Sequence, residues 1–248
     1  MDEGAFEEAA RHFRAAAREE PKDPERWLEL AQAEMAAERP RRAREAYEHA
    51  ALLRPRDARV RILIGFTWEL ERRYDDALVA YVQARALAPN DARTHRTLGT
   101  RLLRWGEFEQ AVEPLARAVA LAPEHAETWN ALGLARYNAG DRSGAIRTFQ
   151  QGTRRHPEHL GLRLGLAAVL VNMHRYPEAL AAYDGIARGW PTFAAAHVGR
   201  ALLLHELGRT REAEAAFARA AEVAADPRPY RARLAQYRRL LRAAPGGH

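Results

Sequence analysis

Two histidines in a short turn are the residues best spaced for metal chemistry. His156 and His159 stand in the segment RRHPEH, at a spacing that could place two imidazole nitrogens on one metal ion. A protein metal site normally needs a third ligand at a suitable spacing. The chain has no cysteine and no further ligand spaced to join this turn. We therefore expect a solvated turn here, with no metal and no cofactor.

Adjacent carboxylates raise the question of acid–base catalysis. Glu7-Glu8 and Asp75-Asp76 fall in the first turns of expected helices, where negative charge complements the helix dipole without any catalytic role. The chain has no phosphate-cradling glycine loop, no metalloprotease signature and no nucleophile elbow. Because no residue pattern supports catalysis, we expect a protein that is not an enzyme.

The elements that position all these residues follow from a repeat of 34 residues. Each copy has an alanine, a large residue four positions later and, in six copies, a proline twelve positions after the alanine. The alanines are Ala9, Ala43, Ala77, Ala111, Ala145, Ala179 and Ala213, the large residues are Phe13, Tyr47, Tyr81, Leu115, Phe149, Tyr183 and Phe217, and the prolines are Pro21, Pro55, Pro89, Pro123, Pro157 and Pro191.

The first half of each copy agrees less closely. An aliphatic residue recurs, with Arg200 as the exception, and a small residue follows it at Ala31, Gly65, Gly99, Gly133, Ala167 and Ala201. Three positions before the aliphatic residue stand Trp27 and Trp129, and His95 and His197 in other copies. The repeat position therefore explains these two histidines by packing.

This pattern predicts pairs of antiparallel helices. Small residues let two helices approach closely, and the large residue lies on the same helix face as the alanine four positions before it. The proline ends the second helix because it has no N–H to donate. We expect the turn between paired helices to lie at segments such as 138–141, Asn-Ala-Gly-Asp.

The period and the residue types resemble those of the tetratricopeptide repeat (TPR) family. The resemblance covers about residues 2–227 and implies an all-α fold, a right-handed α-solenoid of helix-turn-helix units. We expect an N-terminal half repeat at 1–23, which supplies only a second helix. Six units are expected to follow at 24–57, 58–91, 92–125, 126–159, 160–193 and 194–227.

The two ends leave alternatives open. Because Met1 falls in the middle of a unit, the chain is either cut from a longer protein or begins with a half repeat. Residues 228–248 hold six arginines and no acid, which accounts for the whole net charge of +6. We expect a basic capping helix with an apolar stripe, followed by a tail at 245–248; the alternative is a helix that contacts nucleic acid or an anionic membrane.

The resemblance also implies a binding site, because TPR proteins hold peptides or helices on a concave groove lined by first helices. Carried over position by position, the predicted peptide-binding residues are Arg93, Arg96, Thr100, Arg104, Asn130, Leu134, Tyr137, Asn138, Leu164, Val171 and Leu202. Arg59, Phe66 and Glu69 occupy matching positions, and Gly165, Ala168 and Gly199 are expected to leave room for a bulky side chain.

A groove of this composition favours an acidic peptide segment or helix with apolar anchors. The arginines could instead be solvated, or paired with Glu127 and other local acids. The chaperone-carboxylate clamp known in some TPR proteins is not expected, because Arg96 is followed by Thr100 and Ala131 where that clamp has asparagines.

We therefore expect a protein–protein interaction scaffold or adaptor that binds a partner protein. The alternatives are a self-assembling homo-oligomer, the recognition arm of a larger enzyme, or a nucleic-acid-associated protein. Nucleic acid is the less favoured partner, because a single terminal basic stripe is a weak signal. The chain has no run of 18 apolar residues, and a cytoplasmic location is expected.

Overall fold

The computed structural model describes residues 3–243, and their side chains from 6 to 242. Over this range the chain forms fourteen α-helices and no strand, so the predicted all-α fold is confirmed. The tail predicted at 245–248 lies outside the described residues. None of the helices within 3–243 is both long enough and apolar enough to cross a membrane.

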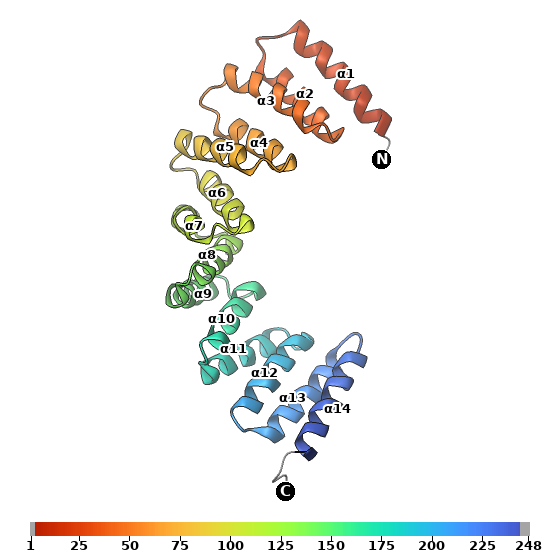
Figure 1. The fold of residues 1–248 in the computed structure, drawn as a ribbon, viewed down its shortest axis with the longest axis vertical. Helices are drawn as coiled ribbons and strands as arrows, with labels where there is room; N and C mark the ends of the chain where they lie inside the picture. The colour runs from red at the N-terminus through yellow and green to blue at the C-terminus, as the bar shows by residue number, and fades with distance from the viewer. Residues whose placement is uncertain (1–2, 244–248) are drawn as a thin grey trace. The chain divides into compact units, whose positions relative to one another are not determined.

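The helices group into two compact units, at 1–123 and 124–248. Within each unit, successive helices pack against their neighbours in chain order (Figure 1). The first unit contains α1 (Glu3–Glu19), α2 (Pro24–Ala36), α3 (Pro40–Leu53), α4 (Ala58–Leu70), α5 (Tyr74–Leu87), α6 (Ala92–Trp105) and α7 (Phe108–Leu121). The second contains α8 (Ala126–Asn138), α9 (Arg142–Arg155), α10 (Leu160–Asn172), α11 (Tyr176–Gly189), α12 (Ala194–Glu206), α13 (Thr210–Val223) and α14 (Arg228–Ala243).

Large side chains of the second helices fill the spaces beside small residues. A Cβ atom added at Gly133 would lie 2.5 Å from the ring of Phe149, and one added at Gly65 would lie 2.6 Å from the ring of Tyr81. Phe149 is completely buried, and Tyr81 almost completely. The small residue therefore allows the two helices of each pair to pack closely together, as the repeat predicts.

The turn inside each helix pair uses one left-handed residue at the same repeat position. Gly106, Gly140 and Gly208 have φ values of 87°, 88° and 73°, a conformation that glycine adopts without strain. Glu38, Arg72 and His174 adopt it in the other copies, with φ between 55° and 59°. The turn geometry is therefore kept even where the sequence has no glycine.

A side-chain N–H donor closes the loop between consecutive repeats. The nitrogen donates to the carbonyl of the proline six residues earlier, and in different copies it belongs to a tryptophan, a histidine or an arginine. The bonds are Trp27 Nε1 to Pro21 (3.0 Å), His95 Nε2 to Pro89 (2.9 Å), Arg163 Nε to Pro157 (2.8 Å) and His197 Nε2 to Pro191 (3.0 Å). The histidines thus have a bonding role as well as a packing one.

Replacing His197 with phenylalanine is expected to lower the free energy of unfolding by about 1 kcal/mol, the usual net value of one hydrogen bond. The same change at His95 should cost less, because it also removes a buried Nδ1 atom that has no hydrogen-bond partner within the described residues. Urea unfolding of both variants measures this difference. Equal losses would show that the unpartnered Nδ1 atom of His95 carries no cost.

Candidate protein-interaction site

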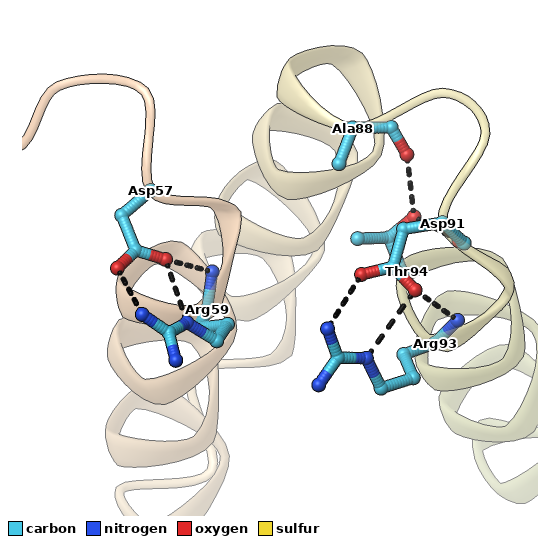
Figure 2. A network of polar contacts seen from close by, with 6 residues as sticks. All are labelled: Asp57, Arg59, Ala88, Asp91, Arg93 and Thr94. Carbon is cyan, nitrogen blue, oxygen red and sulfur yellow. Dashed lines mark hydrogen bonds and ion pairs between the residues drawn. The ribbon is translucent and has the colours of Figure 1, made fainter.

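The helices α4 and α6 are the first helices of two consecutive repeats, and they are in contact with each other. Each of them begins with the same short motif. The segment Asp-Ala-Arg occurs at 57–59 and again at 91–93. Asp57 accepts hydrogen bonds from the backbone N–H of Arg59 and from Arg59 Nε and Nη2, at 3.0, 3.1 and 2.9 Å (Figure 2). The carboxylate therefore caps the helix and holds the guanidinium at once.

Asp91 repeats the arrangement one repeat later. It accepts from the backbone N–H, Nε and Nη2 of Arg93 at 2.9, 3.3 and 3.1 Å. The side-chain hydrogen bonds from Arg59 and Arg93 hold the pKa values of Asp57 and Asp91 below their ordinary range. Both carboxylates are therefore charged at neutral pH, and each fork pairs a carboxylate with a guanidinium.

A pocket of about 280 Å³ opens between these two helix ends. Its walls combine basic and aliphatic side chains, and the lining residues are Ala58, Arg59, Ile62, Leu63, Asp91, Arg93, Thr94, Arg96 and Thr97. Arg93 holds the salt bridge to Asp91, whereas the half-buried Arg96 acts on Asp91 only through longer-range Coulombic attraction. Within the described residues, Arg96 therefore has no carboxylate at ion-pairing distance.

The pocket brings together two of the three predicted arginines. Arg93 and Arg96 line it, but Arg104 stands exposed eight residues further along α6 and is not part of the lining. Thr100 donates its hydroxyl to the carbonyls of Arg96 (2.8 Å) and Thr97 (3.1 Å) of its own helix. Sequence reasoning missed Ile62, although it lies one helical turn after Arg59.

The carboxylate of Glu69 interacts with two neighbouring side chains. Its Oε2 atom accepts from the Tyr81 hydroxyl at 2.7 Å and lies 3.1 Å from Arg101 Nε. The Arg101 guanidinium also lies 5.7 Å from the centre of the Phe66 ring. Burial, followed by the hydrogen bond to Glu69, raises the pKa of Tyr81 far above its ordinary value. This network joins α4, α5 and α6 toward the C-terminal ends of α4 and α6, and none of its residues lines the pocket.

The predicted residues of the second unit differ in exposure. Leu134 and Leu202 are exposed, and Asn138 donates to the carbonyl of Leu134 at 2.9 Å. The remaining predicted residues, which are half-buried, are Asn130, Tyr137, Leu164 and Val171. Tyr137 and Val171 pack against the largest core cluster of this unit. Within the set, the two leucines therefore offer the most accessible apolar surface.

The expected space beside Gly165 and Gly199 is absent, and this prediction was wrong. A Cβ atom at Gly165 would overlap the ring of Phe149, and one at Gly199 would overlap the ring of Tyr183. Both rings come from the second helix of the preceding repeat. The glycines are small because they receive these rings, so no bulky ligand side chain can enter there.

In the turn that contains His156 and His159, the side chain of His159 has a structural role. His159 Nδ1 accepts the backbone N–H of Leu162 at 3.2 Å and so caps α10, while its Nε2 lies 3.6 Å from Glu127. The part of the chain described by the structure contains no group of three or more histidine, aspartate or glutamate side chains arranged to hold a metal ion.

Family models for the tetratricopeptide repeat match most of the chain. One matches residues 1–65, and a second matches 96–159, 130–192 and 164–229. The chain belongs to the TPR family. This confirms the resemblance seen in the 34-residue spacing, and it makes the protein a member of a family of protein-interaction repeats, which bind other proteins.

Solved structures support the TPR fold. The chain is 22% identical to YrrB, described as a TPR protein with an unusual peptide-binding site, with a TM-score of 0.62 over 76% of this chain and 97% of that one. It is 26% identical to MamA, with a TM-score of 0.59 over 64% and 94%. A part of a TPR protein from Cytophaga hutchinsonii gives a TM-score of 0.75 at 13% identity, over 88% and 90%. No curated protein matches the sequence.

Proposed function

We propose that this TPR protein is a non-enzymatic scaffold that binds an acidic peptide segment of a partner protein at the pocket between α4 and α6. The observation that carries the proposal is Arg96, a half-buried guanidinium with which no carboxylate of the described residues forms an ion pair, in a pocket that also contains Ile62 and Leu63. A ligand with an acidic side chain next to an aliphatic one can pair with the arginines and pack against the aliphatic residues of this pocket.

The two aspartate–arginine forks support this proposal. Arg59 and Arg93 are already held by Asp57 and Asp91, so a ligand that contacts them does not have to immobilise flexible side chains. Each guanidinium has five N–H donors, and its own aspartate engages only those on Nε and Nη2. Donors on both arginines therefore remain for a carboxylate.

For the second unit, taken by itself, we propose apolar contacts to a partner protein through its own predicted residues, with Leu134 and Leu202 as the main anchors. Their exposure supports this role, because an apolar anchor gains affinity only if it is accessible in the free protein and buried in the complex. The other proposed contacts are Asn130, Tyr137, Asn138, Leu164 and Val171.

The decisive experiment compares single charge reversals along α6. A fluorescein-labelled peptide containing Asp-Glu-Leu-Leu is titrated with the parent chain, Arg96→Glu and Arg104→Glu, and binding is followed by fluorescence anisotropy. Arg96→Glu should weaken binding at least tenfold, or about 1.4 kcal/mol, because it places a negative charge in the pocket. Arg104→Glu, outside the pocket, should change the Kd less than threefold. Equal effects of the two variants would remove the pocket from the site.

A further inference from the structure

The last helix, α14, uses its apolar stripe for packing. Tyr237 is buried, its ring centre lies 4.9 Å from that of Phe217, and its hydroxyl lies 3.2 Å from His205 Nδ1. Leu234 and Leu241 are partly buried against the same core cluster. The stripe is therefore covered by α12 and α13, and the exposed surface of α14 lies on its other faces.

One of these exposed faces is basic and has a small residue at its centre. Ala235 is exposed, and the side chains at i−4, i+3, i+4 and i+7 from it are all arginines. Together with Leu234 they line a shallow groove of about 320 Å³, whose residues are Arg231, Leu234, Ala235, Arg238, Arg239 and Arg242.

Few of these arginines have an acidic neighbour. Arg238 Nε lies 2.6 Å from Glu214 of α13. Within residues 3–243, no carboxylate lies at ion-pairing distance from Arg231, Arg239 or Arg242. The groove therefore carries uncompensated positive charge around Ala235.

The repeat itself shows what fits against such a face. Ala235 falls at the repeat position of the small residues Ala31, Gly65, Gly99, Gly133, Ala167 and Ala201, all of which are buried. At the glycines among them, the covering group is a large side chain of the second helix: Tyr81, Leu115 or Phe149.

A second position of the same face agrees. Arg238 stands at the repeat position of Arg136. The guanidinium of Arg136 donates to Thr148 Oγ1 and to the carbonyl of Gly144, both on the second helix α9. Two positions of α14 thus match those that receive a second helix elsewhere in the chain.

We propose that this face of α14 binds an amphipathic helix of a partner protein. The helix would place a large apolar side chain against Ala235 and acidic side chains opposite Arg231, Arg239 and Arg242. The surface shares no residue with the pocket between α4 and α6, and the inference does not rest on the function proposed there.

The observations favour a helix over other polyanionic partners. A nucleic-acid backbone would use the arginines but would gain nothing from a small residue at the centre of the face. Insertion into an anionic membrane needs an exposed apolar stripe, and the stripe of α14 is packed against its own unit. A helix with an apolar side chain and acidic flanks uses both features of the groove.

The test uses a peptide taken from the chain's own second helix. The probe is a fluorescein-labelled peptide of residues 142–155 in which all four arginines are replaced by glutamate, so that it keeps Ala145, Phe149 and Gly152. Ala235→Tyr should weaken its binding to the full chain at least tenfold by blocking close approach, and Arg231→Glu/Arg242→Glu at least tenfold by reversing charge. Arg233→Glu, which lies outside this groove, should change binding less than threefold.

Folding and alternative occupants are checked in the same series. Unchanged circular dichroism and melting temperature are expected for all variants, because the replaced residues are exposed. A second probe with alanine in place of Phe149 should bind at least tenfold more weakly. If both probes bind equally, or if duplex DNA binds the chain and Ala235→Tyr does not affect it, the helix assignment is overturned. A molecular mass that rises with concentration and is restored to the monomer value by Ala235→Tyr would identify a second copy as the occupant and overturn the assignment to a different protein.

Discussion

Replacing Phe149 with alanine is expected to lower the free energy of unfolding by about 3–5 kcal/mol, the range found when a large buried ring is removed. Phe149 is fully buried. Its ring lies against both Gly133 of its own repeat and Gly165 of the next, where added Cβ atoms would collide with it. The surrounding helices can therefore collapse only partly into the space that the ring leaves.

Urea unfolding followed by circular dichroism measures this loss. Leu134→Ala is the matched control, and its cost should stay below about 1 kcal/mol because Leu134 is exposed. A reciprocal test uses Gly133→Ala, which should cost about 1–3 kcal/mol in the parent chain by overpacking. In the Phe149→Ala background the same change should cost nothing. A full cost in both backgrounds would show that the ring does not set the requirement for glycine.

Replacing Arg44 with alanine is expected to cost about 2–3 kcal/mol, because it removes a hydrogen bond to a charged group and a stacking contact together. Arg44 is only 12% exposed and donates to Glu71, which is equally buried. The Arg44 guanidinium carbon lies 3.4 Å from the centre of the Trp68 ring, and the Arg73 guanidinium carbon lies 4.2 Å from it. These contacts join α3 to α4 and to the turn after α4.

Arg41→Ala is the control, because Arg41 binds the same carboxylate at 3.1 Å but is 81% exposed. Its loss should cost less than about 1 kcal/mol, as is usual for an exposed ion pair. A cost for Arg41→Ala equal to that for Arg44→Ala would contradict the assigned role of burial and stacking.

The pH dependence gives an independent check of the Arg44 interaction. Burial raises the pKa of Glu71, but hydrogen bonds from Arg44 and Arg41 outweigh it, and the pKa lies below its ordinary value. The ion pair therefore stabilises the fold above the ordinary pKa of glutamate, and this stability is lost as the pH falls through the lowered value. The stability difference between the parent chain and Arg44→Ala should shrink over that acidic range. A difference that stays constant with pH would place the whole effect in the Trp68 contact.

The helix pairs could be predicted from sequence because their determinants are local. An alanine and a large residue four positions apart share one helix face, and a proline after them ends the helix, so Ala145, Phe149 and Pro157 already predict α9 and its end. The small residue at Gly133 could be assigned to close packing for the same reason. The observed helix starts preserve the 34-residue spacing from Pro24 to Arg228.

The properties of the candidate site depended on three-dimensional contacts. Arg93 and Arg96 have the same side chain, but only Arg93 has a carboxylate two residues before it at a capping position, so only its charge is locally balanced. Gly165 was expected to leave space, because the spacing within its own helix does not reveal its neighbour. That neighbour is the ring of Phe149, which belongs to the preceding repeat. Spacing within one helix reports which residues share a face, and the side chain that fills the facing space comes from another helix.

Every contact between described helices joins neighbours in the chain, or helices with one other helix between them. No described helix needs a segment distant in the sequence to bury its apolar face. A chain with this contact pattern can acquire structure progressively as it leaves the ribosome, with α1 to α3 packed while the residues of α14 are still untranslated. Apolar surface is then buried in the order in which the helices are synthesised. Each apolar face is exposed for a shorter time, which reduces the opportunity for aggregation.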